Sequence, residues 1–300
     1  MPDRTKRLYW ARRGKHYQAP QMTRFDLQRD VLGPALTLGL WSWSHYVFRP
    51  AQMMKSAGLY HPQAIGVPPV SRTLGGCGPD LSRREARPVF LASEPEHYDS
   101  VVGFDECSDE YAYAVKPFSQ PVFEELIALL VPYLSPSARI LDPSAGPGSE
   151  AIALSRLVPD GEVVAADLSR GMVETAFRNA LLAGRANMAF FQADVGNPPA
   201  AFEGYFDAVV CCLAFHHYPD GLAAARAFRR VLRPDGLAFI ADPGPQWFNE
   251  MSRDFAKLAD PGFIQHRTGA QFQMLFREAG FSSVYWVEAL PGIGITIASP

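Results

Sequence analysis

The chain has 300 residues, of which 48% are hydrophobic and 20% are charged, so it holds enough apolar material to bury a large core. Its formal net charge of -3 provides no general attraction to nucleic acids or anionic membranes. The four cysteines, Cys77, Cys107, Cys211 and Cys212, show no Cys-x-x-Cys spacing and no grouping with histidine. This pattern argues against a zinc site and a disulfide scaffold, and it fits a reducing cytoplasm.

Residues 1–115 are rich in aromatic side chains and follow no regular strand or helix alternation. We expect them to form a mostly helical N-terminal cap that also binds the substrate. Residues 31–48 contain no charged side chain of Asp, Glu, Lys or Arg, but Pro34, Ser44 and His45 interrupt the apolar run. This predicts a buried or interface helix with no stable membrane insertion, and shallow membrane contact is the alternative.

From residue 116 to residue 300 the hydrophobic periods alternate between those of strands and helices, which predicts a parallel sheet covered by helices. The last two predicted strands are joined by too few residues for a helical crossover, so they are expected to form an antiparallel hairpin. The fold class predicted is α/β, a Rossmann-like, mostly parallel sheet of seven strands. The strands are expected at 139–141, 162–166, 188–192, 206–212, 237–241, 284–288 and 294–298. The helices are expected at 118–134, with Pro121 in the first turn, from the glycine turn after the first strand to about 156, at 169–183, from Asp220 to 232, and from Thr268 to Gly280, where Thr268 and Gln271 form a capping box.

The turn after the first of these core strands reads "DPSAGPGSEA", with Gly146 and Gly148 before a helix. Glycines let the backbone approach a ligand closely, and the start of a helix offers unpaired N–H groups, so a nucleotide-like ligand is expected. The same letters satisfy the dinucleotide fingerprint, and Asp167 follows about twenty residues on. A nicotinamide-dependent oxidoreductase is therefore an alternative, although the terminal hairpin argues against it.

Six segments in order, "ILDPSAGPG", "VVAADLS", "FQADV", "CCLAFHHYPD", "VLRPDG" and "LFREAGF", resemble the class I S-adenosylmethionine-dependent methyltransferases. The similarity covers residues 118–300 and is greatest to the small-molecule branch that includes the menaquinone and ubiquinone C-methyltransferases. It implies S-adenosylmethionine as cofactor and S-adenosylhomocysteine as product. One departure is Ser144, which stands where the family usually has the first glycine of its loop.

The resemblance also implies a set of cofactor contacts. Asp142 would hold the methionine ammonium, Asp167 the ribose hydroxyls, and Asp194 with the Val195 N–H the adenine. The full set of cofactor-binding residues implied is Asp142, Ser144, Gly146, Gly148, Asp167, Leu168, Met172, Asp194, Val195 and Cys211, in which Leu168 and Met172 sandwich the adenine and Cys211 contributes a backbone carbonyl.

His216 and His217 lie in the loop after the fourth strand, which faces the substrate in this fold. We predict them as catalytic residues, since a histidine there could remove a proton from the acceptor; pocket shaping is the alternative role. Tyr98, Tyr111, Tyr113 and Phe118 are predicted to line the acceptor pocket, which suggests a largely apolar acceptor. No metal site is predicted.

The function expected is transfer of a methyl group from S-adenosylmethionine to oxygen or carbon of a small molecule in secondary or quinone-like metabolism. The alternative is a protein that binds S-adenosylmethionine for other chemistry, such as cyclisation, or for regulation. Nucleic acid is not expected as a partner, because the fourth strand lacks the Asn/Asp-Pro-Pro-aromatic motif of DNA amino-methylating enzymes. A homodimer through the N-terminal region and a cytoplasmic location are further expectations.

Overall fold

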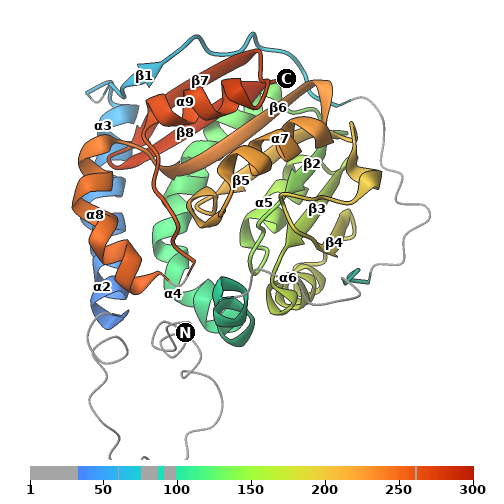
Figure 1. Cartoon of the computed structure of the whole chain (residues 1–300), viewed down its shortest axis with the longest axis horizontal. Helices are drawn as coiled ribbons and strands as arrows, with labels where there is room; N and C mark the ends of the chain where they lie inside the picture. The colour runs from blue at the N-terminus through green and yellow to red at the C-terminus, as the bar shows by residue number, and fades with distance from the viewer. Residues whose placement is uncertain (1–32, 60, 76–86, 91–98, 261) are drawn as a thin grey trace, which may run out of the picture.

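The computed structural model describes residues 33–59, 61–75, 87–90, 99–260 and 262–300, and it describes only the backbone of residues 33–37, 99–114, 255, 258 and 259. An eight-stranded sheet runs through the middle of the molecule with helices on both faces (Figure 1). Its strand order is β1-β7-β8-β6-β5-β2-β3-β4. The strands are β1 (Ala64–Ile65), β2 (Arg139–Asp142), β3 (Glu162–Asp167), β4 (Met188–Gln192), β5 (Phe206–Cys212), β6 (Leu232–Pro243), β7 (Ser283–Leu290) and β8 (Ile293–Ser299).

Strands β2 to β6 are parallel, and β7 and β8 join the sheet antiparallel. The predicted α/β fold with a terminal antiparallel hairpin is therefore confirmed. The main helices are α2 (Gly33–Trp43), α3 (Arg49–Ser56), α4 (Asp99–Leu130), α5 (Ser149–Leu157), α6 (Arg170–Leu182), α7 (Gly221–Val231), α8 (Gln246–Ala259) and α9 (Gly269–Glu278), with short helical segments η2 (Ser44–Phe48), η4 (Val131–Tyr133), η5 (Ala200–Phe202) and η6 (Phe215–His217).

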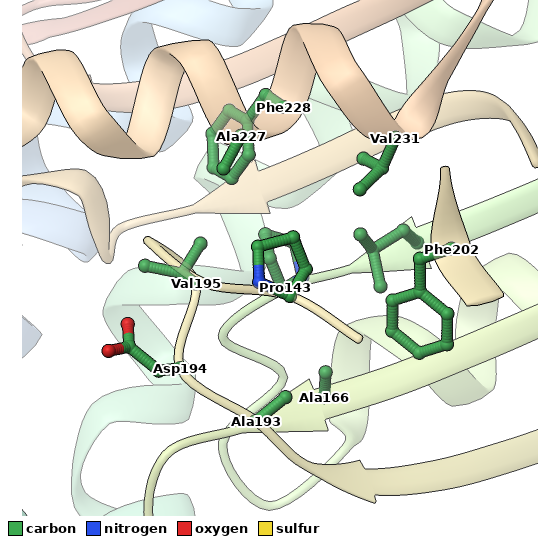
Figure 2. Close-up of a pocket in the computed structure, with 11 residues that line it drawn as sticks. Pro143, Ala166, Ala193, Asp194, Val195, Phe202, Ala227, Phe228 and Val231 are labelled. Carbon is green, nitrogen blue, oxygen red and sulfur yellow. The ribbon is translucent and has the colours of Figure 1, made fainter. Parts of the chain in front are cut away.

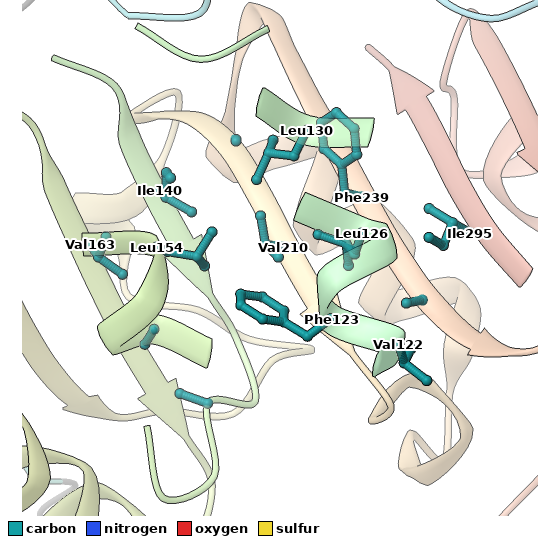
Figure 3. Packing of buried hydrophobic residues seen from close by; sticks show 14 of the residues in the cluster. Val122, Phe123, Leu126, Leu130, Ile140, Leu154, Val163, Val210, Phe239 and Ile295 are labelled. Atoms are coloured by element: carbon teal, nitrogen blue, oxygen red, sulfur yellow. The ribbon is translucent and has the colours of Figure 1, made fainter. Parts of the chain in front are cut away.

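Two apolar layers hold the sheet between its helices. On one face, Leu126 and Leu130 of α4 pack with Ile140, Val210 and Phe239 of the central strands (Figure 3). The other layer joins side chains of α7 and α9 to the opposite face of the same strands. Strand β5 is buried along almost its whole length, which explains why its sequence is apolar without alternation.

The strand count differs from the sequence-based prediction by one. Ala64 and Ile65, in the expected cap, form strand β1, which pairs antiparallel with Val287 and Trp286 of β7. So short a strand has no periodicity to detect. Strand β6 also begins earlier than expected, at Leu232, so the "RPDG" letters lie within it, beside a register shift in its pairing with β5.

Helix α4 is longer than predicted and continues from Asp99 across the expected boundary at residue 115. Pro121, expected in a first helical turn, lies inside this helix together with Pro117. An internal proline removes one backbone hydrogen bond. The buried Val122, Leu126 and Leu130 offset that loss, so tertiary packing overrides the local signal. The division into a cap of residues 1–115 and a core of residues 116–300 stays a prediction.

The apolar run at residues 31–48 forms α2 and η2, which lie beside α4 at the edge of the molecule (Figure 1). Ser44 and Phe48 are buried, whereas Trp41 and Tyr46 are exposed. The interface helix predicted from the sequence is therefore present. Among the residues that the structure describes, we find no helix with the length and apolar character needed to span a membrane.

The predicted capping box of α9 is present: the Gln271 N–H donates to Thr268 Oγ1, and the Thr268 N–H donates to Gln271 Oε1. We expect Thr268→Ala to lower the free energy of unfolding by about 1 kcal/mol, because the Gln271 N–H loses its acceptor. Urea-induced unfolding measures the difference. Thr268→Ser, which keeps the hydroxyl, should stay near the wild-type stability; equal losses in the two variants would contradict the capping role.

Candidate functional site

The glycine turn between β2 and α5 lies at the carboxyl edge of the parallel strands. Gly146 and Gly148 have φ angles of 51° and 85°, in the left-handed region that favours glycine. A Cβ on Gly148 would lie 2.8 Å from the Cβ of Ala176, so this glycine permits α5 to pack on α6. A Cβ on Gly146 would meet nothing within 4 Å, so the backbone there borders open space that a ligand can fill.

Asp167, at the end of β3, holds the turn in place. One oxygen of its carboxylate, Oδ2, accepts the N–H of Gly146 at 2.9 Å, and the other, Oδ1, accepts the N–H of Ser169 at 2.9 Å. The Ser169 hydroxyl in turn caps α6 by accepting the N–H of Met172. A carboxylate oxygen can accept more than one hydrogen bond, which is the chemistry that a ribose diol requires.

Three acidic side chains crowd around the turn. Burial, followed by the charges of Glu150 and Asp167, raises the pKa of Asp142 well above its usual range, although the Ser144 N–H donates to it. Burial also raises the pKa of Glu150, which lies in the first turn of α5. A cationic ligand would relieve this repulsion, and S-adenosylmethionine carries an ammonium and a sulfonium. The residues present therefore fit that cofactor.

The sequence-based prediction included Asp142 and Asp167 but missed Glu150. Glu150 is part of the "GPGSEA" motif, in the first turn of α5. An acid at this position is also expected in a helix without a ligand, because acids stabilise helix N-termini, so the sequence carries no specific sign of a binding role. Only the folded structure shows that Glu150 acts electrostatically on Asp142.

The residues predicted for the adenine lie at the neighbouring strand ends. The Ala193 N–H donates to the Asp167 carbonyl, and Gln192 Nε2 donates to the Leu168 carbonyl at 3.1 Å, which ties the end of β3 to the end of β4. Asp194 follows directly and caps its own turn by accepting the Gly196 N–H. The chain therefore brings Asp167, Leu168 and Asp194 to one edge, as the resemblance implies.

A pocket lies under the loop that follows β4, on the side of α7 (Figure 2). Its lining is almost entirely apolar and includes Phe202 and Phe228, while the Asp194 carboxylate lies at the margin and points away from Phe202. Val195 also contributes to it. Met172 lies on α6 and is not part of the lining of this pocket. Its side chain is buried, with 2% exposed. Whether Leu168 and Met172 enclose an adenine stays a prediction.

Ser144, the departure from the family pattern, has a specific partner. Its hydroxyl lies 2.6 Å from the Tyr218 hydroxyl, which is buried and also lies 3.4 Å from Cys211 Sγ. This chain of polar groups links the glycine turn to the end of β5. Leu213, directly after β5, has a φ of 52°, a strained conformation for leucine.

The two predicted catalytic histidines form one cluster with two carboxylates. His216 Nδ1 donates to Asp242 Oδ1 at 2.6 Å, and its Nε2 lies 3.2 Å from Asp260 Oδ2. His217 Nε2 lies 3.0 Å from the same oxygen of Asp260. Asp242 ends β6 and Asp260 follows α8, so neither partner is near the histidines in sequence.

The charges in this cluster depend on one another. Burial alone would lower the pKa of His216, but Asp242 and Asp260 raise it to about 10. Burial would raise the pKa of Asp260, but His217 and His216 hold it well below its usual range. In this arrangement His216 is protonated at neutral pH, so the predicted role of a base rests on His217.

An aromatic cluster connects the N-terminal helices to these histidines, and the sequence analysis did not identify it. Ring centroids are separated by 5.5 Å between Trp43 and Phe248, 6.4 Å between Phe248 and His266, 4.7 Å between His266 and Phe263, and 6.3 Å between Phe263 and His216. Helices α2 and α8 lie side by side on the same flank of the sheet (Figure 1). The residues come from three separate segments and share no local motif.

The acceptor-lining residues predicted from the sequence are only partly described. Tyr98 lies outside the described residues, and Tyr111 and Tyr113 lie on α4 in the part whose side chains are not described. Phe118 is buried and packs against Phe48, with ring centroids 5.1 Å apart. Phe118 therefore contributes to the core, and its contact with an acceptor stays a prediction.

Comparison with known proteins identifies the central part of the chain. Residues 140–236 match the family model described as a methyltransferase domain. The chain is 32% identical over 143 residues to nocamycin O-methyltransferase of Saccharothrix syringae, covering 47% of this chain and 50% of that protein. It is 35% identical over 107 residues to demethylmenaquinone methyltransferase of Thermus thermophilus, covering 36% and 48% respectively. The chain thus spans about half the length of the curated relatives it matches.

A solved structure supports the fold. Human N-acetylserotonin methyltransferase in complex with S-adenosylmethionine superposes with a TM-score of 0.54 at 16% identity, covering 68% of this chain and 59% of that one. The family match and the sequence relatives confirm the resemblance predicted from the sequence, and the solved structure supports the fold. Residues 140–236 are therefore a methyltransferase domain, and this match does not support the alternative of a nicotinamide-dependent oxidoreductase.

We expect Asp167→Ala to weaken the binding of S-adenosylhomocysteine by about 10- to 100-fold, because a charged hydrogen-bond acceptor is lost. Calorimetric titration of the purified chain measures the affinity, with NADH as a second ligand that should not bind. Glu174→Gln, an exposed change on the neighbouring helix α6, is the matched control and should bind normally. Unchanged affinity in Asp167→Ala would contradict the assigned role.

We also expect Ser144→Ala and Tyr218→Phe to be coupled by about 1 kcal/mol in a double-mutant cycle of unfolding free energies, because each removes one end of the same hydrogen bond. Urea-induced unfolding of the two single variants and the double variant gives the coupling. The pair Ser144→Ala and Tyr205→Phe should show none, since Tyr205 bonds Glu162 instead. Additive losses for the first pair would show that the contact has no energetic effect.

Proposed function

We propose that this chain, whose residues 140–236 form a methyltransferase domain, transfers a methyl group from S-adenosylmethionine to an oxygen or carbon atom of a largely apolar small molecule. The observation that carries the proposal is the crowding of three acids around a glycine turn that borders open space. When bound, S-adenosylmethionine supplies an electrophilic methyl group on a positively charged sulfur.

The protein's main task in such a reaction is alignment. Asp142 and Glu150 would hold the ammonium end of the cofactor, and Asp167 would accept from its ribose. Fixing the cofactor at the ends of β2 and β3 and the acceptor near β5 and β6 sets the direction of attack. Alignment of this kind contributes on the order of 7–11 kcal/mol to lowering a barrier.

The acceptor side is apolar and aromatic. Phe263 packs against His216, and the aromatic side chains continue from it through His266 and Phe248 to Trp43. A planar or extended apolar molecule would therefore be favoured there. The curated relatives, named as acting in nocamycin and demethylmenaquinone methylation, support a small-molecule acceptor of this kind. Secondary or quinone-like metabolism is the setting proposed, without nucleic acid as a partner. The cytoplasmic location and the homodimer stay predictions.

The other candidate function is binding of S-adenosylmethionine without methyl transfer. One assay distinguishes the two functions. The purified chain is incubated with methyl-labelled S-adenosylmethionine and the metabolites of a cell extract. Methylation predicts label in an organic-extractable product and a matching amount of S-adenosylhomocysteine. Tight cofactor binding with no label transferred would favour the alternative.

We expect His217→Ala to lower the rate of methyl transfer by about 10²- to 10⁴-fold, because the acceptor proton is no longer removed efficiently. The affinity for S-adenosylhomocysteine should not change, since His217 lies in η6 and its ring contacts Asp260 and His216. Single-turnover transfer of label measures the rate, and calorimetry measures the affinity. Full activity in His217→Ala would exclude a role for this side chain in the reaction.

A further inference from the structure

Three metal-ligating atoms converge where η6 meets the end of α8. The Nε2 atoms of His216 and His217 lie 3.2 and 3.0 Å from the same oxygen, Asp260 Oδ2, and all three atoms lie within 4.8 Å of one another. Ligands of a tetrahedral zinc ion with bonds of about 2.0–2.1 Å are roughly 3.3 Å apart. A small adjustment of the side chains would therefore let all three atoms reach one ion.

Further contacts orient two of these ligands. The bond from His216 Nδ1 to Asp242 leaves the Nε2 atom as the one that faces His217 and Asp260. Asp260 Oδ1 accepts the Gly262 N–H at 2.9 Å, which leaves Oδ2 for the histidines. A carboxylate behind a ligating histidine is the usual outer arrangement of metal sites.

When both histidines are neutral, as histidine ligands of a metal ion are, the cluster keeps the negative charges of Asp242 and Asp260. Asp242 is 1% exposed, and its second oxygen, Oδ2, has no hydrogen-bond partner among the residues that the structure describes. Arg267 is a cationic side chain that interacts electrostatically with Asp242. With neutral imidazoles, two carboxylates face one guanidinium, so a bound cation would reduce the imbalance.

We propose that His216, His217 and Asp260 form a binding site for one divalent first-row transition-metal ion, with Asp242 orienting His216. Two imidazole nitrogens and one carboxylate oxygen suit Zn²⁺, Fe²⁺ or Co²⁺ better than the oxygen-seeking Mg²⁺ and Ca²⁺. The sequence predicts no metal site because 43 and 44 residues separate Asp260 from the two histidines. Without an ion, hydrogen bonds connect the Nε2 atoms of His216 and His217 to Asp260 Oδ2.

Three protein ligands leave at least one coordination position for another group. The side chains of His217 and Asp260 are 17% and 23% exposed, so this position is accessible. A divalent ion strongly promotes loss of the proton from a hydroxyl that it binds, which points to an acceptor with a phenol or enol group. With an ion bound, His217 acts as a ligand in place of its role as a base, and its removal still slows transfer because the ion is lost. The acceptor's proton passes to solvent, the oxygen bonds the methyl carbon, and the carbon–sulfur bond breaks to leave a thioether. This role rests on the proposed function; metal binding itself does not.

The test uses the full chain, freed of metal with a chelator and dialysed, and titrated with Co²⁺ while visible absorption is recorded. We expect one equivalent to produce the d–d bands of a nitrogen- and oxygen-ligated ion, and Zn²⁺ to displace it. His217→Ala and Asp260→Asn should abolish the bands. Asp242→Asn, which keeps the shape of the side chain, should weaken binding by about 10- to 100-fold.

Matched controls separate the site from surface binding. His61→Ala and Asp254→Asn change an exposed histidine and an exposed acid of α8, and both should titrate like the wild type. Absence of the bands, or an unchanged titration in His217→Ala and Asp260→Asn, would overturn the inference. Calorimetry with S-adenosylhomocysteine shows whether each variant is folded.

The metal inference and the proposed function can fail separately. Transfer of label in the presence of chelator, with no Co²⁺ binding, would refute the metal site and leave methyl transfer standing. Stoichiometric Co²⁺ binding with no label transferred to any acceptor would retain the site and refute the proposed function.

Discussion

The electrostatic strain among Asp142, Glu150 and Asp167 is the constraint on which the site depends. Three carboxylates lie around a backbone turn whose glycines, Gly146 and Gly148, have no side chain. Burial raises the pKa of two of these carboxylates, those of Asp142 and Glu150. The fold maintains this arrangement because Asp167 accepts backbone N–H groups from both sides. A ligand with positive charge at one end and hydroxyl groups at the other satisfies all three acids together.

The sheet places a second set of polar groups next to the first. Strands β2 and β5 are neighbours in the sheet, so the glycine turn and the histidine cluster follow adjacent parallel strands. The contact between Ser144 and Tyr218 joins the two regions directly. A cofactor at one and an acceptor at the other would lie side by side, which is the geometry that methyl transfer needs.

Local signals predicted the central elements well. Strands at 188–192 and 206–212 match β4 and β5 because each is an apolar run closed by turn residues, and the capping box of Thr268 and Gln271 marks the start of α9. Strand β1 was missed because two residues are too few to show a periodicity, and α4 begins earlier than the helix predicted at 118–134. Asp260 and the aromatic cluster of Trp43, Phe248 and Phe263 were missed for another reason: distant segments bring them together, and a single sequence carries no sign of that contact.

The most direct measurement of the central claim compares two ligands by calorimetry: S-adenosylhomocysteine, and methylthioadenosine, which lacks the ammonium-bearing part. If Asp142 and Glu150 hold the ammonium, methylthioadenosine should bind about 10- to 100-fold more weakly. In Glu150→Gln the difference between the two ligands should shrink. Equal affinity of the wild-type chain for both ligands would contradict the claim that the crowded acids recognise a cationic cofactor.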